Sequence, residues 1–197
     1  AAKSVLMYFG LAFFLIMHFT FFYVRSGIIT TYVLLSAVVP VIWLLGIMPI
    51  VELGLDPLSI LVPFLIFAIA VSHAVQMTNA WKLEMAYAND STLSAAKSFE
   101  KLFVPGSIAL IANAIGFMVI AFVDITVVRE MAFVATLGVS LMIISNKILL
   151  PILLSYCPSN IKFSQSLNDS APLEANWIKL AIIFQKPYLV FILLLAG

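Results

Sequence analysis

Four polar side chains lie close together in the second half of an apolar stretch, Ile60–Trp81. Helical geometry places three of them, Ser72, Gln76 and Asn79, on one stripe, with His73 at its edge. Histidine can take and release a proton near neutral pH, so the stripe could be a proton relay, an ion site or a substrate contact. Polar groups at membrane depth are costly unless the protein satisfies them. We therefore take this stripe as the first candidate site.

In a competing interpretation, the same residues form structural hydrogen bonds between helices, each of which stabilises the bundle by about 0.6 kcal/mol. We prefer the functional interpretation because four polar groups exceed what packing needs, and we choose His73 as the best single residue. Asn113, inside another apolar stretch, could contact the helix of His73, or it could be an amide bonded at a packing interface.

Two further stretches hold isolated polar residues. Lys147 is the only charge well inside an apolar segment, next to Asn146. It could be an ion-relay partner, but we expect its ammonium to extend to the cytoplasmic surface, as long basic side chains near helix ends do. His18 is a lone histidine, which we interpret as structural.

The composition defines the broad class of protein. Hydrophobic residues make up 64% of the 197 residues and charged residues 10%, against about 45–50% and about 25% in soluble domains. This predicts an integral membrane protein. The net charge of +1 gives no indication of nucleic-acid binding, and one cysteine, Cys157, excludes an internal disulfide framework. Because no nucleotide-binding, metal-ligand or nucleophile motif is present, we expect no enzyme activity, no metal and no cofactor.

The apolar segments predict an all-α, polytopic transmembrane helix bundle with five full spans and the start of a sixth, because only helices or closed barrels satisfy backbone groups in lipid. The spans are about Val5–Val24, Thr31–Val51, Ile60–Trp81, Pro105–Val123 and Met131–Tyr156. Pro105 suits the first turn of its helix. The sixth, residues 187–197, has about half the roughly 20 residues that a span needs, so we expect it to be truncated.

The segments between the spans predict how the chain is divided into parts and which side of the membrane each loop faces. Residues 1–157 form the five-helix unit, and an amphipathic surface helix near 91–104 follows a cap at Asp90–Ser91. Residues 158–186 form a linker with a second surface helix. Most lysines and arginines fall on one side of the spans, which the positive-inside rule makes cytoplasmic. We therefore expect residues 82–104 and 158–186 to be cytoplasmic, and residues 52–59 and 124–130 to face outward.

Three segments carry a family resemblance. They are GLDPLSILVPFLIFAIAVSHAVQMTNA, VPGSIALIANAIGF and VREMAFVATLGV. Together they resemble the resistance-nodulation-division (RND) superfamily, in particular the MmpL-like hydrophobe exporters. The likeness covers nearly the whole chain and corresponds to the second to sixth spans of that fold. The same unit resembles the sterol-sensing domain (SSD). At the position where that superfamily often has an acidic proton-relay residue followed by tyrosine, this chain has Ser72 and His73.

The resemblance implies a function. The chain is expected to be a membrane segment of a secondary-active, proton-coupled exporter, which moves lipidic or hydrophobic molecules and lies in the inner (plasma) membrane. The alternative is a sterol-sensing-like module that binds lipid and regulates without transporting. The implied partners are membrane lipids, a hydrophobic substrate, and the second half and extracytoplasmic domain of a full-length transporter. A homo-oligomer is left open, and no nucleic-acid partner is expected.

Overall fold

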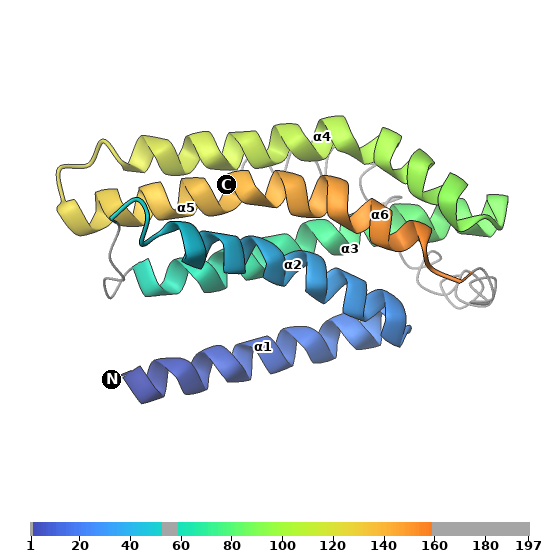
Figure 1. Cartoon of the computed structure of the whole chain (residues 1–197), viewed down its shortest axis with the longest axis horizontal. Helices are drawn as coiled ribbons and strands as arrows, with labels where there is room; N and C mark the ends of the chain where they lie inside the picture. The colour runs from blue at the N-terminus through green and yellow to red at the C-terminus, as the bar shows by residue number, and fades with distance from the viewer. Residues whose placement is uncertain (1, 53–58, 159–197) are drawn as a thin grey trace, which may run out of the picture. The chain divides into compact units, whose positions relative to one another are not determined.

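The computed structural model describes residues 2–52 and 59–158, and within these ranges the chain is an all-α bundle without strands (Figure 1). The predicted fold class is thus confirmed. The predicted linker and truncated span, residues 158–186 and 187–197, lie outside the described ranges from residue 159 onward. The helices are α1 (Ala2–Val24), α2 (Gly27–Ile47), α3 (Val62–Ala88), α4 (Ser91–Ile120), α5 (Thr126–Ile144) and α6 (Leu150–Ser155), with a 3₁₀ turn η1 (Ser59–Leu61) and a π-helical turn η2 (Ser145–Leu149).

Four helical stretches in the described ranges are long and apolar enough to cross a membrane: Gly27–Ile47, Ser59–Ala88, Ser91–Ile120 and Thr126–Ser155. A shorter apolar stretch, Gly10–Val24, lies in α1. The chain is therefore a multi-pass membrane protein.

One turn between two long helices follows directly from its residue types. Asn89 ends α3 in the left-handed conformation, with φ 49°, which asparagine tolerates better than most residues. Asp90 then caps α4, where its carboxylate accepts a hydrogen bond from the backbone N–H of Leu93 at 2.8 Å. The cap predicted at this position is confirmed.

The amphipathic segment after this cap does not end where the sequence predicts. Residues 91–104 and the following span form one continuous helix, α4, with Pro105 in its interior rather than in its first turn. The sequence argument failed because it treated proline as a helix start, whereas a long helix can accommodate an interior proline with a lost hydrogen bond. The amphipathic segment and the span are therefore parts of one helix.

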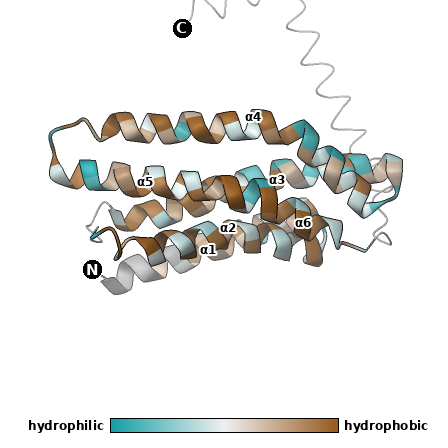
Figure 2. Cartoon of the chain, turned by 45° about the horizontal axis from the view of Figure 1, so that its top comes forward, coloured by the Kyte–Doolittle hydropathy of each residue, from teal (hydrophilic) through white to brown (hydrophobic). Residues whose placement is uncertain are grey.

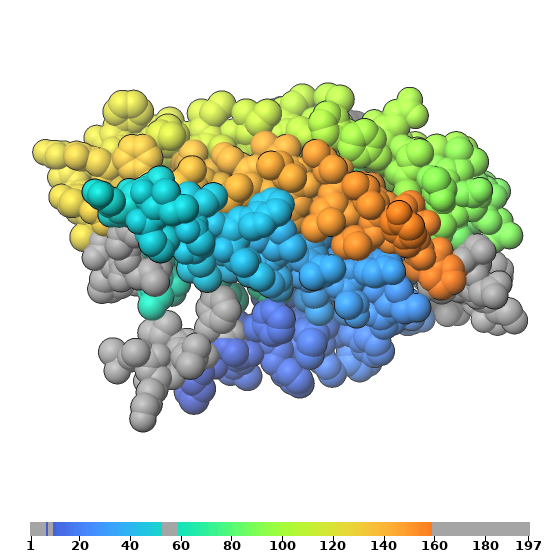
Figure 3. All heavy atoms as spheres, in the orientation of Figure 1, coloured from blue at the N-terminus to red at the C-terminus, as the bar shows by residue number. Residues whose placement is uncertain are grey.

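The core lies among α2, α3 and α5, which pack against one another. Figure 3 shows α2 alongside the continuous helix of α5, η2 and α6 on one face. The second half of α4 is different, since Leu110 is its only buried residue. Hydrophobic residues make up much of this exposed helix, and hydrophilic residues gather toward the ends of the bundle (Figure 2).

At one end of the bundle, two hydrogen bonds join the helices in pairs, α1 with α3 and α4 with the end of α6. Lys82 of α3 donates to the backbone carbonyl of Val24, at the end of α1, at 2.7 Å. Ser91, at the start of α4, donates to the carbonyl of Cys157, just after α6, at 2.5 Å. These are the termini that the charge pattern assigns to one side, and Figure 1 shows them at the same end.

Candidate functional site

The polar stripe of α3 divides between two environments. Ser72 and Gln76 are exposed, Asn79 is half-buried, and His73 is buried with 9% of its surface exposed. A step of one residue turns a helix by about 100°, so His73 points inward while its neighbour Ser72 points away from the bundle. Two residues of the predicted stripe, Ser72 and Gln76, therefore face out of the described bundle, whereas Asn79 lies beside α1.

Asn79 contacts another helix. Its side-chain amide donates a hydrogen bond to the hydroxyl of Tyr23 on α1 at 2.8 Å. This is the interhelical hydrogen bond that the competing interpretation of the stripe expected. It joins α1 to α3, together with the stacked rings of Phe13 and Phe67, whose centres lie 5.0 Å apart.

His73 is the one residue of the four that enters the interior. Its Nδ1 is buried and has no hydrogen-bond partner among the described side chains and backbone. A buried ring nitrogen without a partner is unusual in a packed interior. His73 therefore retains hydrogen-bonding capacity toward a water, a proton or a group that these residues do not supply.

A second polar group comes from the π-helical turn η2. Its consecutive residues Ser145, Asn146 and Lys147 are all buried, at 0%, 0% and 1% exposure. Such turns are rare and often occur at functional sites. Ser145 donates from its hydroxyl to the backbone carbonyl of Ser36 on α2. Both polar atoms of the Asn146 amide are buried without a partner in the described structure.

The position of Lys147 corrects a prediction. We expected its ammonium to extend to the cytoplasmic surface, but the side chain is enclosed between helices and lies against Gly106 of α4. The wider π turn brings three consecutive residues inward, which a regular helix cannot do as readily. Within the described ranges, no carboxylate forms an ion pair with Lys147.

The remaining predicted residues lie apart from this interior group. Asn113 is exposed on α4, and no hydrogen bond of its side chain to a described residue is found. His18 is exposed on α1, where its ring contacts Phe22 at a centre-to-centre distance of 4.5 Å. Gly116, three residues after Asn113, faces open space.

Sequence reasoning missed two residues that the fold brings to Lys147 and its neighbours. Gly106 provides the space that Lys147 fills, and Ser107 beside it has a buried hydroxyl without a partner among the described residues. Their position directly after Pro105 was a usable signal, because an interior proline followed by glycine and serine marks an irregular and closely approached helix segment.

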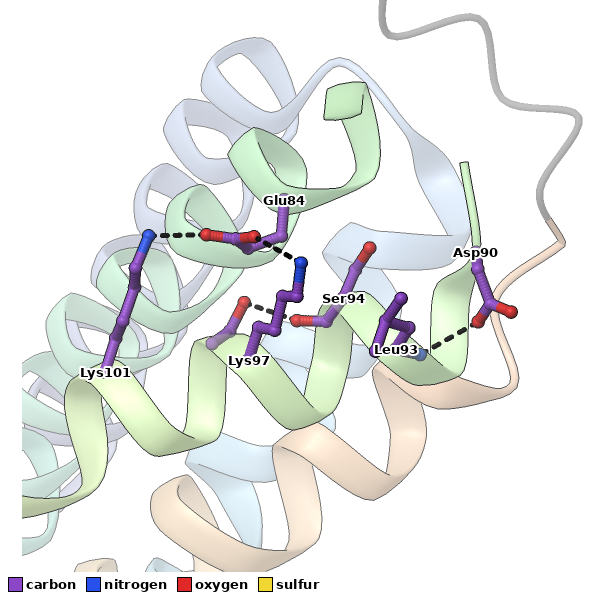
Figure 4. Close-up of polar contacts among 7 residues, drawn as sticks. Glu84, Asp90, Leu93, Ser94, Lys97 and Lys101 are labelled. Atoms are coloured by element: carbon purple, nitrogen blue, oxygen red, sulfur yellow. Dashed lines mark hydrogen bonds and ion pairs between the residues drawn. The ribbon is translucent and has the colours of Figure 1, made fainter. Parts of the chain in front are cut away.

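A separate polar cluster ties α3 to the first half of α4. Glu84 is 7% exposed and lies between two lysines of α4, with its carboxylate 2.5 Å from the Lys101 ammonium and 3.9 Å from that of Lys97 (Figure 4). These contacts are structural, since they fix the amphipathic part of α4 against the end of α3.

Two surface grooves accompany these sites. One, of about 530 Å³, lies between α1 and α3 and is lined by Phe19, Thr20, Phe22, Tyr23 and Val75. The other, of about 490 Å³, lies between α4 and the helix of η2 and α6. Both are mainly apolar, and the first ends beside the Asn79–Tyr23 hydrogen bond.

No protein-family model, curated protein or solved structure matches this chain. The class of protein that the fold and site define is thus a multi-pass, all-α membrane protein with a polar interior group.

Proposed function

We propose that this chain is a membrane segment of a secondary-active, proton-coupled exporter of lipidic or hydrophobic molecules, of the RND type and in the inner (plasma) membrane. The observation that carries the proposal is the arrangement of α3, which turns Ser72 and Gln76 outward and His73 inward. Polar side chains on an outward face at membrane depth need a protein partner. The resemblance of the three segments to MmpL-like exporters supports the same reading.

In this proposal, the outward face of α3 packs against further helices of the complete transporter. Transporters of this type hold their sites between repeats near the middle of the membrane. Ser72 and Gln76 would then lie at such a junction and His73 directly behind it. The chain acts with a partner half and an extracytoplasmic domain, and it moves its substrate by an ion gradient rather than by enzymatic chemistry.

His73 is the proposed proton carrier. Its Nδ1 has a free lone pair or hydrogen in the interior, because no described group bonds to it. When the neighbouring helices shift, the His73 ring can move from the dry interior of the bundle to the polar junction beside Ser72 and Gln76, and back. Such a change of environment is what loads and releases a proton on an imidazole.

The test is His73→Gln in the native full-length protein, with His18→Gln as the matched control. Glutamine can replace a hydrogen bond but cannot carry the proton. We expect His73→Gln, at normal abundance, to abolish substrate efflux driven by a proton gradient, while His18→Gln retains it because His18 is exposed on α1. Retained efflux with an unchanged pH profile in His73→Gln would refute the role of His73.

One observation favours a second function, a sterol-sensing-like module that binds lipid without transport. The groove between α1 and α3 is apolar and has room for part of a lipid chain. A photoactivatable sterol or fatty-acid probe should then label Phe19 or Phe22 in purified protein. Labelling without gradient-driven flux in the reconstituted full-length protein would favour this second function over the exporter.

A further inference from the structure

Lys147 and Gly106 occupy one shared space between η2 and α4. A Cβ atom built on Gly106 would lie 2.5 Å from Cε of Lys147 and still closer to its Nζ. Such distances do not occur between real atoms, so position 106 admits no side chain while Lys147 keeps its place. The missing side chain at position 106 leaves the space that the end of Lys147 fills, and only 1% of that residue is exposed.

The sequence neighbours of both residues have buried polar atoms without a partner in the described structure. Asn146 precedes Lys147 and has a buried amide whose oxygen and nitrogen are both free within the described structure. Ser107 follows Gly106 and has a buried hydroxyl that also has no hydrogen-bond partner within the described structure. A carbonyl and a hydroxyl oxygen can accept hydrogen bonds from an ammonium or from a water bound to it. A few internal waters would satisfy such a group of atoms.

Lys147 has no recorded counter-ion in the described ranges. The elements packed on η2 are α2, α3, α4, α5 and α6. Of these, α2 and α6 contain no charged residue. On α3 and α4, Glu84 is engaged by Lys97 and Lys101, Lys82 bonds to Val24, and Glu100 is exposed. On α5, Arg129 and Glu130 lie some 17 residues before Lys147, or roughly 26 Å along a helix. The other titratable side chains on these elements are Tyr32 on α2, Tyr87 on α3, which is exposed, and His73 on α3, which is buried.

We propose that Lys147 is a second proton-exchanging group, placed in the space that Gly106 leaves and solvated by Asn146, Ser107 and the waters bound to them. The lone pair of the neutral amine accepts a proton from a hydronium ion, which leaves water, and the ammonium later returns that proton to water. Two cations in one interior repel each other when no anion lies between them, so a proton on Lys147 disfavours a second proton on His73. This inference rests on the proposed proton-coupled function and adds its second residue.

A direct test observes Lys147 without measuring transport. The chain, labelled with ¹⁵N at lysine Nζ and reconstituted in lipid nanodiscs, is studied by NMR over a series of pH values. The Lys147 signal is assigned by its absence from Lys147→Met, or from Lys147→Arg if the methionine variant does not fold. We expect this signal to change from ammonium to neutral amine within the series. A Lys147 signal that never changes would overturn the proposal.

A second test uses the shared space. Gly106→Ala should displace Nζ and thereby alter the Lys147 titration, whereas Gly116→Ala, which faces open space, should leave it unchanged. Equal titration in both variants would contradict the proposed role of Gly106. In the full-length protein, Lys147→Arg keeps a permanent cation and should lose gradient-driven efflux. If Lys147 titrates but the full-length protein shows no gradient-driven efflux, the exporter function is refuted and this inference is not. If the protein shows efflux but Lys147 does not titrate, this inference is refuted and the exporter function is not.

Discussion

Gly138 of α5 lies directly against the side chain of Ile66 on α3. A Cβ atom at Gly138 would be 2.6 Å from Cγ1 of Ile66 and 3.1 Å from Cδ2 of Leu44 on α2. Ile66 and Leu44 are completely buried. Three helices therefore meet at a glycine, which allows the close approach that small residues provide between membrane helices.

Gly138→Ala should destabilise the bundle by about 1–3 kcal/mol, because the added methyl group overpacks this contact. The measurement is the unfolding of purified protein by a denaturing detergent, followed by circular dichroism. Gly116→Ala is the matched control in a membrane helix, since its methyl group meets open space. The control should be neutral or slightly stabilising, because alanine favours helix over glycine.

Ile66→Val in the Gly138→Ala background should recover part of the lost stability. Valine removes the Cδ1 atom that lies 2.8 Å from the added methyl group. Neighbouring residues that share one space give non-additive effects. If the two substitutions were simply additive, the close contact between α3 and α5 would be wrong.

The hydrogen bond between Asn79 and Tyr23 should contribute little to stability. We expect a coupling free energy of about 0.6 kcal/mol from a double-mutant cycle with Asn79→Ala and Tyr23→Phe. Tyr87→Phe is the control, since Tyr87 is 81% exposed and no hydrogen bond of its hydroxyl to the described residues is found. A coupling several times larger would show that Asn79 does more than join α1 to α3.

The ion pair of Glu84 with Lys101 should contribute more to the stability of the protein than its ion pair with Lys97. The Lys101 ammonium is 2.5 Å from the Glu84 carboxylate, whereas the Lys97 ammonium is 3.9 Å away. Lys101→Met should therefore lower the thermal unfolding temperature more than Lys97→Met. Added salt should narrow the difference, because both lysines are partly exposed and their charges are screened. An equal effect of both substitutions would contradict the geometry in Figure 4.

The sequence was sufficient for the features that depend on local chemistry. The length of the apolar segments predicted membrane helices, and Asp90 followed by Ser91 predicted a cap that the structure confirms. Periodicity also placed Ser72 and Gln76 on one face. It could not say which way that face points, because the direction depends on which other helices pack against α3.

The burial of Lys147 was beyond sequence reasoning for a related reason. A lysine near a helix end extends to the surface when the helix is regular, but the π turn at Ser145–Leu149 rotates the residue inward. The space it enters exists only because Gly106, some forty residues earlier in the chain, has no side chain. Pro105 followed by Gly106 marks an irregular helix segment, but neither the π turn nor the pairing of Gly106 with Lys147 can be read from local sequence, because both depend on tertiary packing.

The native cysteine should react slowly with alkylating reagents. Cys157 follows α6 and is 3% exposed, and burial raises the pKa of its thiol above the usual range. Alkylation requires the thiolate, so labelling should be slow at neutral pH and accelerate as the pH rises. The comparison is maleimide labelling of native and detergent-unfolded protein. Equal rates would contradict the burial of this thiol.

The sidedness of the membrane helices can then be measured in a Cys157→Ala background. This substitution should preserve the end of the bundle, because Ser91 bonds to the backbone carbonyl of residue 157 rather than to its side chain.

Tyr87→Cys, near the end of α3, and Asp124→Cys, between α4 and α5, introduce single exposed thiols. In intact cells, an impermeant maleimide should label position 124 but label position 87 only after permeabilisation. The reason is the excess of lysine and arginine at the end that contains Lys82, Lys97 and Lys101, which keeps that end in the cytoplasm. Labelling of both positions from the same side would contradict the orientation and, with it, the direction of proposed export.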